Sequence, residues 1–393
     1  MIESATGDYV DPLPFFMEKV KDNIAPRAEG IILFPQPGKG VVNGKQIHRT
    51  FPVNPTQPIT AWGLIGAGIR AYDHMDGVGN RYGVHTVILE VDGEEVFRSV
   101  VDRFAYEENR YINSWTHGQY MKSFIEPGNR LRMLHASNGN RGLVEINEER
   151  PYRFVYTLSD ALGNTSKVRF TVQGKNTEIH PVEHREKYAF KWDRTNYLQE
   201  PGLELVVPRG MLYDDVWLDY SVRADSGDVA FTYQLHNKRV PLHGACEMRI
   251  GLRRDRLEDK SKYYVAGVTA RGGKYSIGGT YEDGFMKVRI RDLGTYTVAV
   301  DTVPPEIIPL NPGQWGRTGR ITLKAKDKET GINSYRGTID GKYALFGKPN
   351  SISGNLVCEL DPKHVKKGGR HTVEMTVTDG RGNRTTEEFH FVW

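Results

Sequence analysis

The sequence predicts an all-β protein built from three consecutive β-sandwich domains of the immunoglobulin-like kind. The composition is rich in turn and strand residues, with 42 glycines and 20 tyrosines among 393 residues, and long helix-forming periodic stretches are scarce. An ordered set of turn motifs occurs twice, once early and once late in the chain. Between the two copies lies a block of short β-branched and aromatic runs separated by glycine turns.

The overall composition is that of a globular protein with substantial cores, because 38% of the residues are hydrophobic and 26% are charged. A formal net charge of +4 without a dominant Lys/Arg block gives no electrostatic case for nucleic-acid binding. No run of about 18 apolar residues is present, so no transmembrane segment is predicted. The two cysteines, Cys246 and Cys358, are too few for a disulfide scaffold, and we expect buried free thiols in a monomeric protein.

The repeated set, called the repeat motifs below, consists of five features in a fixed order. They are a proline-containing linker (Asp22–Pro26 and Asp301–Pro305), an Ala-x-Asp element (Ala71–Asp73 and Ala325–Asp327), an Asp-Gly turn (92–93 and 340–341), an Asp-x-x-Gly-Asn turn (Asp160–Asn164 and Asp379–Asn383) and a closing alternating run. Glycine and asparagine accept positive φ, and aspartate bonds nearby amides. The Asp-Gly pairs flanked by alternating runs predict hairpins.

These motifs predict two related sandwiches at residues 23–175 and 301–393, with another sandwich at 185–300 between them. The Asp-x-x-Gly-Asn turns are candidates for calcium sites, but calcium prefers six to eight oxygen ligands. The sequence places at most two acidic groups near each turn. We therefore expect ordinary turns and no metal ligands in the chain.

An insertion at residues 102–133 lengthens the first sandwich relative to the last and is dense in aromatic residues. Four of them are candidates to stack on a sugar or a peptide: Tyr106, Tyr111, Trp115 and Tyr120. The alternative is that these rings pack the insertion onto its own sandwich.

Motifs that would carry catalysis are missing from the sequence. It contains no Gly-x-Ser-x-Gly elbow, no phosphate-binding loop and no His-x-His pair. His180 and His184 are four residues apart, but Pro181 between them disfavours the helical turn that a shared metal would need. We expect no catalytic residue and no cofactor in this chain.

The stretch GDYVDPLPFF at residues 7–16 resembles the tail that follows the catalytic His-x-His strand in lysostaphin-like (LytM-type) zinc metallopeptidases. Val10 to Phe16 fit the Val-Asp-Pro segment of that tail, which ends in apolar residues. The runs at 59–87 and 92–115 resemble the β-sandwich extension of some long bacterial members. The likeness to the extension covers residues 5–393, and the likeness to the catalytic domain covers only the first 16.

The resemblance implies that residues 1–22 are a remnant of a peptidase domain. Zinc and its His and Asp ligands would belong to the part of that domain that is missing, and Asp11 would form a turn. The implied role is that of a non-catalytic accessory region of an exported peptidoglycan endopeptidase, located in the bacterial periplasm or cell envelope. It would position the peptidase or bind peptidoglycan or envelope proteins. Two alternatives stay open: an independent carbohydrate- or peptide-binding protein, and an enzyme whose site is built across domains.

Overall fold

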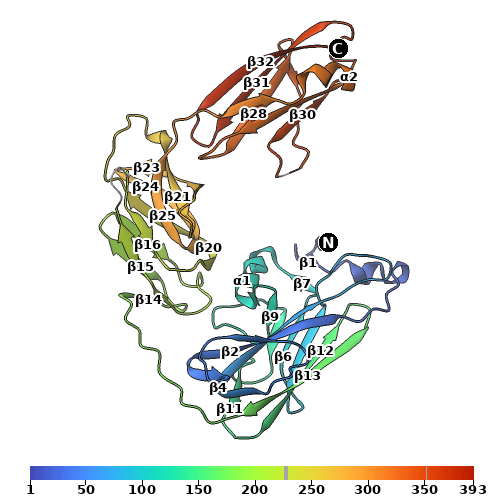
Figure 1. Ribbon diagram of the computed structural model, residues 1–393, viewed down its shortest axis with the longest axis vertical. Helices are drawn as coiled ribbons and strands as arrows, with labels where there is room; N and C mark the ends of the chain where they lie inside the picture. Colours follow the sequence, from blue (N-terminus) through green and yellow to red (C-terminus); the bar gives the residue numbers. More distant parts are fainter. Residues whose placement is uncertain (225–228, 351) are drawn as a thin grey trace. The chain divides into compact units, whose positions relative to one another are not determined.

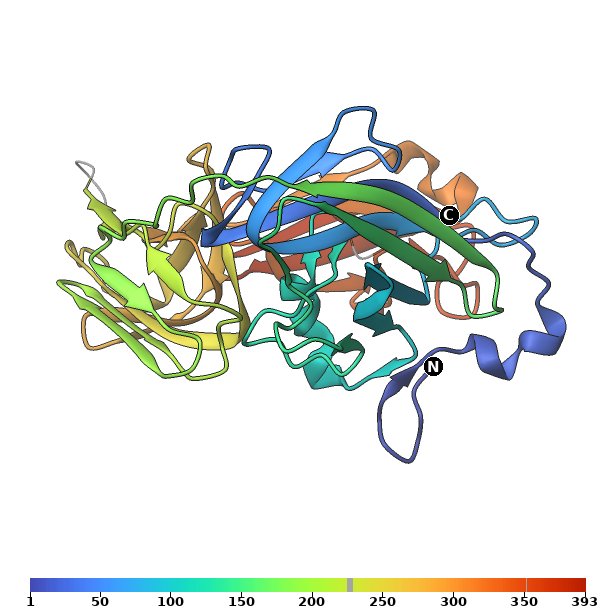
Figure 2. The same ribbon diagram turned by 90° about the horizontal axis from the view of Figure 1, so that it is seen from below.

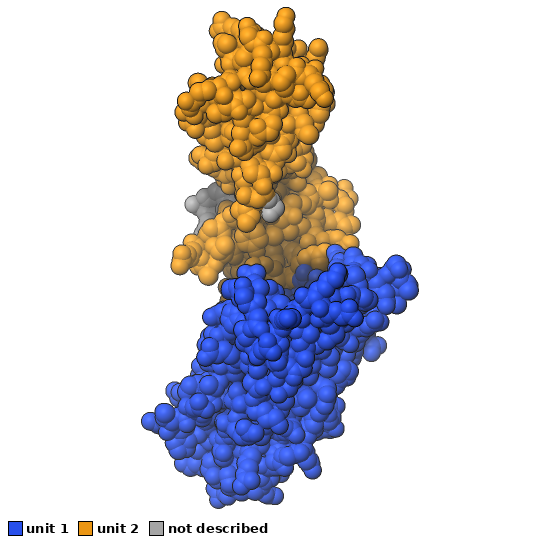
Figure 3. Space-filling model, turned by 90° about the vertical axis from the view of Figure 1, so that its right-hand side faces the viewer, with its two compact units in different colours: residues 1–185, 191–194, 209–216 blue, residues 186–190, 195–208, 217–393 orange. Residues whose placement is uncertain are grey.

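The computed structural model describes residues 1–224, 229–350 and 352–393 and is almost entirely β (Figure 1). The prediction of an all-β fold with sandwich-like sheets is confirmed. The chain forms two compact units, coloured separately in Figure 3. The first contains residues 1–185, 191–194 and 209–216, and the second contains 186–190, 195–208 and 217–393. Among the described residues, no helix is long and apolar enough to cross a membrane.

The first unit is built on one continuous, curled sheet with the strand order β10-β6-β5-β12-β13-β4-β2-β3. Its strands are β2 (Arg27–Val42), β3 (Arg49–Phe51), β4 (Ile59–Tyr72), β5 (Thr86–Val91), β6 (Glu94–Val100), β10 (Leu134–Ala136), β12 (Pro151–Ser159) and β13 (Thr165–Gly174). Three short strands also join it at or beside β4: β8 (Thr116–His117), β9 (Tyr120–Lys122) and β11 (Val144–Ile146). A parallel pairing of Val172 with Ile59 links β13 to β4.

Alternating side chains explain how this sheet encloses a core. In β5 every second residue is buried, and in β12 Tyr152, Phe154, Tyr156 and Leu158 point inward, as the period of two in a strand requires. These residues share one hydrophobic cluster with side chains from β2, β4 and β13. The sheet therefore packs against itself as a sandwich.

The second unit begins with two five-stranded sheets, ordered β15-β16-β20-β24-β23 and β18-β19-β25-β21-β22. Their strands are β15 (Asn196–Glu200), β16 (Leu203–Val207), β18 (Ser221–Arg223), β19 (Thr232–Gln234), β20 (Val240–Gly251), β21 (Tyr263–Val268), β22 (Lys274–Gly278), β23 (Thr280–Glu282), β24 (Phe285–Leu293) and β25 (Thr295–Val300). Before them, β14 (Tyr188–Phe190) pairs with β17 (Val216–Leu218). Cys246 lies in β20, and it is buried and free, as is Cys358.

The end of the second unit repeats the order of four strands of the first unit. Its four-stranded sheet has the order β29-β28-β31-β32, which matches β6-β5-β12-β13. These strands are β28 (Ile332–Ile339), β29 (Lys342–Ala344), β31 (Arg370–Asp379) and β32 (Arg384–Val392); the facing sheet holds β26 (Glu306–Pro309), β27 (Arg320–Lys326) and β30 (Asn355–Glu359). A core around the buried Trp315 joins the two sheets.

The Asp-Gly turns form the predicted hairpins in both copies. Asp92 and Gly93 have φ of 54° and 89°, and Asp340 and Gly341 have φ of 50° and 74°. Two consecutive positive φ values are what a type I′ turn requires. The pairs connect β5 to β6 and β28 to β29.

The Asp-x-x-Gly-Asn turns connect the last two strands in both copies and also hold the linkers. The side-chain amide of Asn164 donates to Asp160 Oδ2 (2.7 Å) and to the Asp22 carbonyl (3.0 Å). The amide of Asn383 donates in the same way to Asp379 Oδ2 (2.7 Å) and to the Asp301 carbonyl (3.0 Å). Each turn thus ties a proline-containing linker to the end of its sandwich where the last two strands are connected.

Replacing Asn164 or Asn383 with Ala is expected to destabilise the sandwich that carries it by about 1–3 kcal/mol, because a part-buried carboxylate and a carbonyl each lose a donor. Calorimetry that separates the unfolding transitions measures the effect. Asn176→Ala, at an exposed position, is the control and should change neither transition. Equal stability of all three variants would contradict this role for the turns.

Candidate functional site

The four aromatic residues proposed as ligand contacts lie in different environments. Trp115, in α1 (Ile112–Trp115), is only 5% exposed, and its indole N–H donates to the Lys122 carbonyl at 3.1 Å. Tyr111 packs against the core, and burial raises the pKa of its hydroxyl. Tyr120 in β9 is half-buried, whereas Tyr106 is 69% exposed. The rings therefore do not form one exposed platform, and ligand contact stays a prediction.

The segment GDYVDPLPFF lies against this insertion. Its strand β1 (Tyr9–Val10) pairs with β7 (Arg103–Phe104), and the rings of Tyr9 and Phe104 stack with centroids 5.3 Å apart. Asp11 Oδ1 accepts the Leu13 N–H at 2.9 Å, so Asp11 forms a turn as expected. In Figure 2 the short helical turns that follow β1 (dark blue) lead the chain back toward β2.

A buried charge fastens the same segment. Asp8 is only 6% exposed and contacts the Arg132 guanidinium at 2.8 Å. That guanidinium also contacts Glu108 at 2.7 Å. Arg132 belongs to the insertion, so strand pairing, ring stacking and an ion pair all hold the segment to the first sandwich.

A half-open cavity of about 590 Å³ lies between the segment and the insertion. Its wall is mostly apolar and includes Tyr9, Leu13, Phe104, Ile112, Trp115 and Met121. Two carboxylates, Asp73 and Asp160, also belong to its lining. An apolar pocket with few polar groups is the usual form of a small-ligand site.

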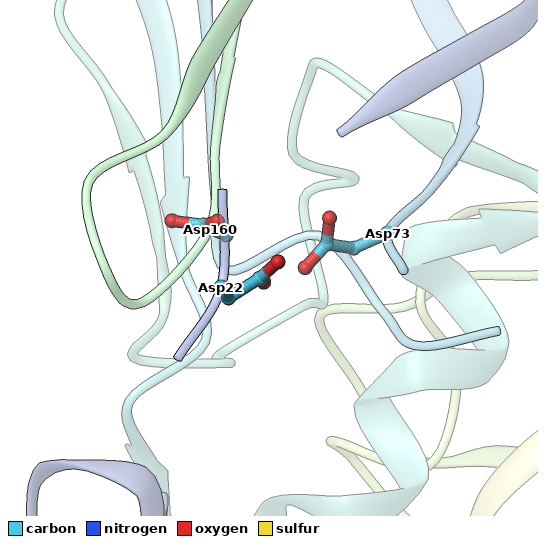
Figure 4. A group of neighbouring side chains, drawn as sticks. All are labelled: Asp22, Asp73 and Asp160. Atoms are coloured by element: carbon cyan, nitrogen blue, oxygen red, sulfur yellow. The ribbon is translucent and has the colours of Figure 1, made fainter. Parts of the chain in front are cut away.

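Those two carboxylates belong to an acidic cluster with Asp22 (Figure 4). One carboxylate oxygen of each residue lies within 4.8 Å of the others. The three residues come from three repeat motifs: the linker, the Ala-x-Asp element after β4, and the turn between β12 and β13. The second copy gathers Asp301, Asp327 and Asp379 in the same manner.

The sequence-based count of at most two acidic groups near each Asp-x-x-Gly-Asn turn was therefore wrong. It considered only residues close to each turn along the chain. The fold adds two carboxylates to that of Asp160 in the first copy. Asp22 comes from the linker, and Asp73 comes from the end of β4, 87 positions before Asp160 in the sequence.

In the first cluster one carboxylate oxygen is not satisfied. Asp160 Oδ1 accepts the N–H groups of Leu162 and Asn164 (2.9 and 2.8 Å), and Asp22 Oδ1 accepts that of Ile24 (3.0 Å). Asp73 is 5% exposed, and its Oδ1 has no hydrogen-bond partner in the described residues.

Burial raises the pKa of Asp73 to about 6, against an ordinary value of 3.8. The neighbouring carboxylates Asp160 and Asp22 add to the increase, while the backbone N–H and the charge of His74 oppose it. The carboxylate form of Asp73 is therefore unfavourable where it stands.

The second cluster differs in its hydrogen bonds. Asp327 Oδ2 accepts three backbone N–H groups, from Glu329, Thr330 and Gly331, at 3.1, 2.8 and 2.7 Å. Asp301 Oδ2 accepts the Thr330 hydroxyl at 2.6 Å. Donors of the protein itself thus solvate the charge at the position that corresponds to Asp73.

Comparison with known proteins gives one family match. Residues 187–301 match the Zu5-like domain, a segment that spans the two five-stranded sheets. No curated protein matches the chain.

Several solved structures share low similarity over most of the chain. SGBP-B of the mixed-linkage glucan utilization locus of Bacteroides ovatus is 11% identical, with 94% of this chain and 70% of that chain covered and a TM-score of 0.14. A 1.5-MDa bacterial ice-binding adhesin is 10% identical (95% and 98% covered, TM-score 0.14). A tetra-tandem repeat from the extending region of a large adhesion protein is 10% identical (95% and 93% covered, TM-score 0.20). At these TM-scores the chains do not superpose as wholes, and the matches carry no argument about function.

Proposed function

We propose that the chain is the non-catalytic accessory region of an exported zinc endopeptidase directed at peptidoglycan, and that its first sandwich orients the peptidase domain. The observation that supports this most strongly is the fastening of residues 8–13, which belong to the stretch 7–16 that resembles the end of a LytM-type peptidase domain. Because the segment is fastened, a domain that precedes it would have a fixed orientation relative to the first sandwich. A freely jointed linker would give no such orientation.

The chemistry of the acidic clusters agrees with an accessory role. Each cluster offers three aspartates. Catalytic zinc sites in hydrolases usually combine histidine with a carboxylate or cysteine and keep one position for water. The three aspartates match the ligand preference of a hard cation better than that of catalytic zinc. Under this proposal, peptide-bond hydrolysis belongs to the peptidase domain and not to these clusters.

Hydrogen exchange measured by mass spectrometry tests the fastening. Arg132→Ala removes the partner of the buried Asp8 carboxylate, so we expect amide exchange in residues 8–13 to accelerate several-fold while β12 and β13 stay protected. Arg169→Ala, at an exposed position in β13, is the matched control and should leave the segment unchanged. If residues 8–13 of the unmodified protein exchange at the rate of an unfolded peptide, the segment cannot orient anything, and the proposed role fails.

The apolar cavity favours a second candidate, an independent carbohydrate- or peptide-binding function. Its size suits a small apolar group, such as a peptide side chain. Ile112 lines it and is 47% exposed, so Ile112→Trp should block entry with little strain on the core. If muropeptides or glycan oligomers bind the unmodified chain and not this variant, the second candidate gains support. If neither muropeptides nor glycan oligomers bind the unmodified chain, the second candidate function is contradicted.

A further inference from the structure

We propose that Asp22, Asp73 and Asp160 together bind one calcium ion, which clamps the linker at Asp22–Pro26 to the end of the first sandwich. This site is independent of the proposed accessory role. It would serve a carbohydrate-binding protein as well as a peptidase extension.

The spacing of the carboxylates fits one shared ion. Calcium bonds to oxygen at 2.3–2.6 Å, so two of its ligands lie no more than about 5.2 Å apart. One carboxylate oxygen from each of the three residues lies within 4.8 Å of the other two. They can therefore coordinate the same ion without rearrangement of the backbone.

The unsatisfied oxygen of Asp73 is the observation that distinguishes this cluster from a group of surface acids. The residue is only 5% exposed, its Oδ1 has no hydrogen-bond partner in the described residues, and Figure 4 shows the carboxyl group facing Asp22. A buried carboxylate oxygen without a hydrogen-bond partner is costly, and a cation shared with two neighbouring carboxylates would compensate that cost.

The ligand chemistry favours calcium over other divalent ions. All the side chains of the cluster offer carboxylate oxygens, which hard cations prefer, whereas zinc and copper favour nitrogen and sulfur ligands. Three carboxylates can supply between three and six oxygens, and water completes a shell of six to eight. Magnesium demands a near-ideal octahedron with bonds of about 2.0–2.1 Å, which this spacing suits less well.

The second cluster provides an internal control with the same topology. There the three N–H groups that bond Asp327 and the hydroxyl that bonds Asp301 supply the positive partners. A bound cation would therefore add less stabilisation to the second cluster than to the first. Asp327→Asn is therefore the matched control for Asp73→Asn, because each substitution removes one charge at the equivalent place in the repeat.

Isothermal titration of the full chain with calcium chloride tests the assignment. We expect the unmodified protein and the Asp327→Asn variant to bind one ion with equal affinity, with a dissociation constant of about 0.1–1 mM, the range of extracellular calcium modules. Asp73→Asn should bind at least tenfold more weakly. Magnesium should bind at least tenfold more weakly than calcium to the unmodified protein.

Hydrogen exchange of residues 20–26 gives a second measurement that does not depend on the heat of binding. Calcium should slow exchange there in the unmodified protein and have no effect in Asp73→Asn, while unchanged protection of β12 and β13 confirms that the variant is folded. The proposal is overturned if calcium at about 5 mM produces neither binding heat nor protection. It is also overturned if Asp73→Asn binds as well as the unmodified protein, or if Asp327→Asn loses binding to the same degree.

Discussion

Asp73→Asn is expected to stabilise the calcium-free protein at pH 7 by up to about 3 kcal/mol. Burial raises the pKa of Asp73 from 3.8 to about 6, and each tenfold change in proton affinity corresponds to about 1.36 kcal/mol between the charged and neutral forms. Above pH 6 the folded protein must hold a buried carboxylate beside Asp22 and Asp160. Asparagine has nearly the same shape without that charge.

The pH dependence of this difference follows from the direction in which the pKa of Asp73 moves. A raised pKa means that the folded state binds a proton more tightly than the unfolded state. The resulting stabilisation is fully present below pH 3.8 and is lost as the pH rises through about 6. The advantage of Asp73→Asn should therefore be small near pH 4, grow between pH 4 and 6, and stay constant above.

Urea unfolding of both proteins in chelator, across this pH range, measures the difference in unfolding free energy. Other titrating groups, including Asp92 and Asp340, whose pKa values are lowered by their partners, are common to both proteins and cancel. With saturating calcium the order should reverse, because only the unmodified protein keeps its ligand. A difference that does not vary with pH would contradict the assigned environment of Asp73.

Trp115→Ala is expected to destabilise the first sandwich by about 3–5 kcal/mol, the usual cost of emptying a buried tryptophan site. Trp115 is 5% exposed and belongs to the main core of the unit. The substitution also leaves the Lys122 carbonyl without its indole donor. Denaturant unfolding followed by far-UV circular dichroism measures the loss.

Tyr106→Ala is the control, because this ring is 69% exposed and its loss should cost less than about 1 kcal/mol. Tests of ligand binding in the insertion should therefore use Tyr106. A loss of binding in Trp115→Ala would not distinguish unfolding of the sandwich from loss of a ligand contact. Similar destabilisation by both substitutions would show that the insertion packs differently from the structure described above.

The features that the sequence predicted well are local ones. The two Asp-Gly pairs adopt positive φ and form hairpins, and the alternating run before the first pair, β5, buries every second residue. The order of the repeat motifs also has a structural counterpart. Strands β6-β5-β12-β13 and β29-β28-β31-β32 share one arrangement, and Asn164 and Asn383 make the same two bonds.

The features that the sequence did not predict depend on contacts between distant segments. Asp22, Asp73 and Asp160 each belong to a repeat motif, yet their convergence depends on the linker lying beside the end of β4. The recurrence of aspartate at three corresponding places in both copies was the signal that could have indicated this. Packing of the insertion rings onto the sandwich was one of two alternatives that the sequence left open, because an aromatic residue in an insertion fits both a surface and a core position; Trp115 is buried.

The proposal that the chain is part of a peptidase is tested most directly by the mass and sequence of the native protein that carries these residues. If the chain is the accessory region of a zinc endopeptidase, mass spectrometry will find a protein larger than the 44.5 kDa of these 393 residues. Peptides from a domain with His, Asp and a His-x-His pair will precede Met1. A native protein of 44.5 kDa that begins at Met1 would contradict that account and leave a ligand-binding sandwich protein as its replacement.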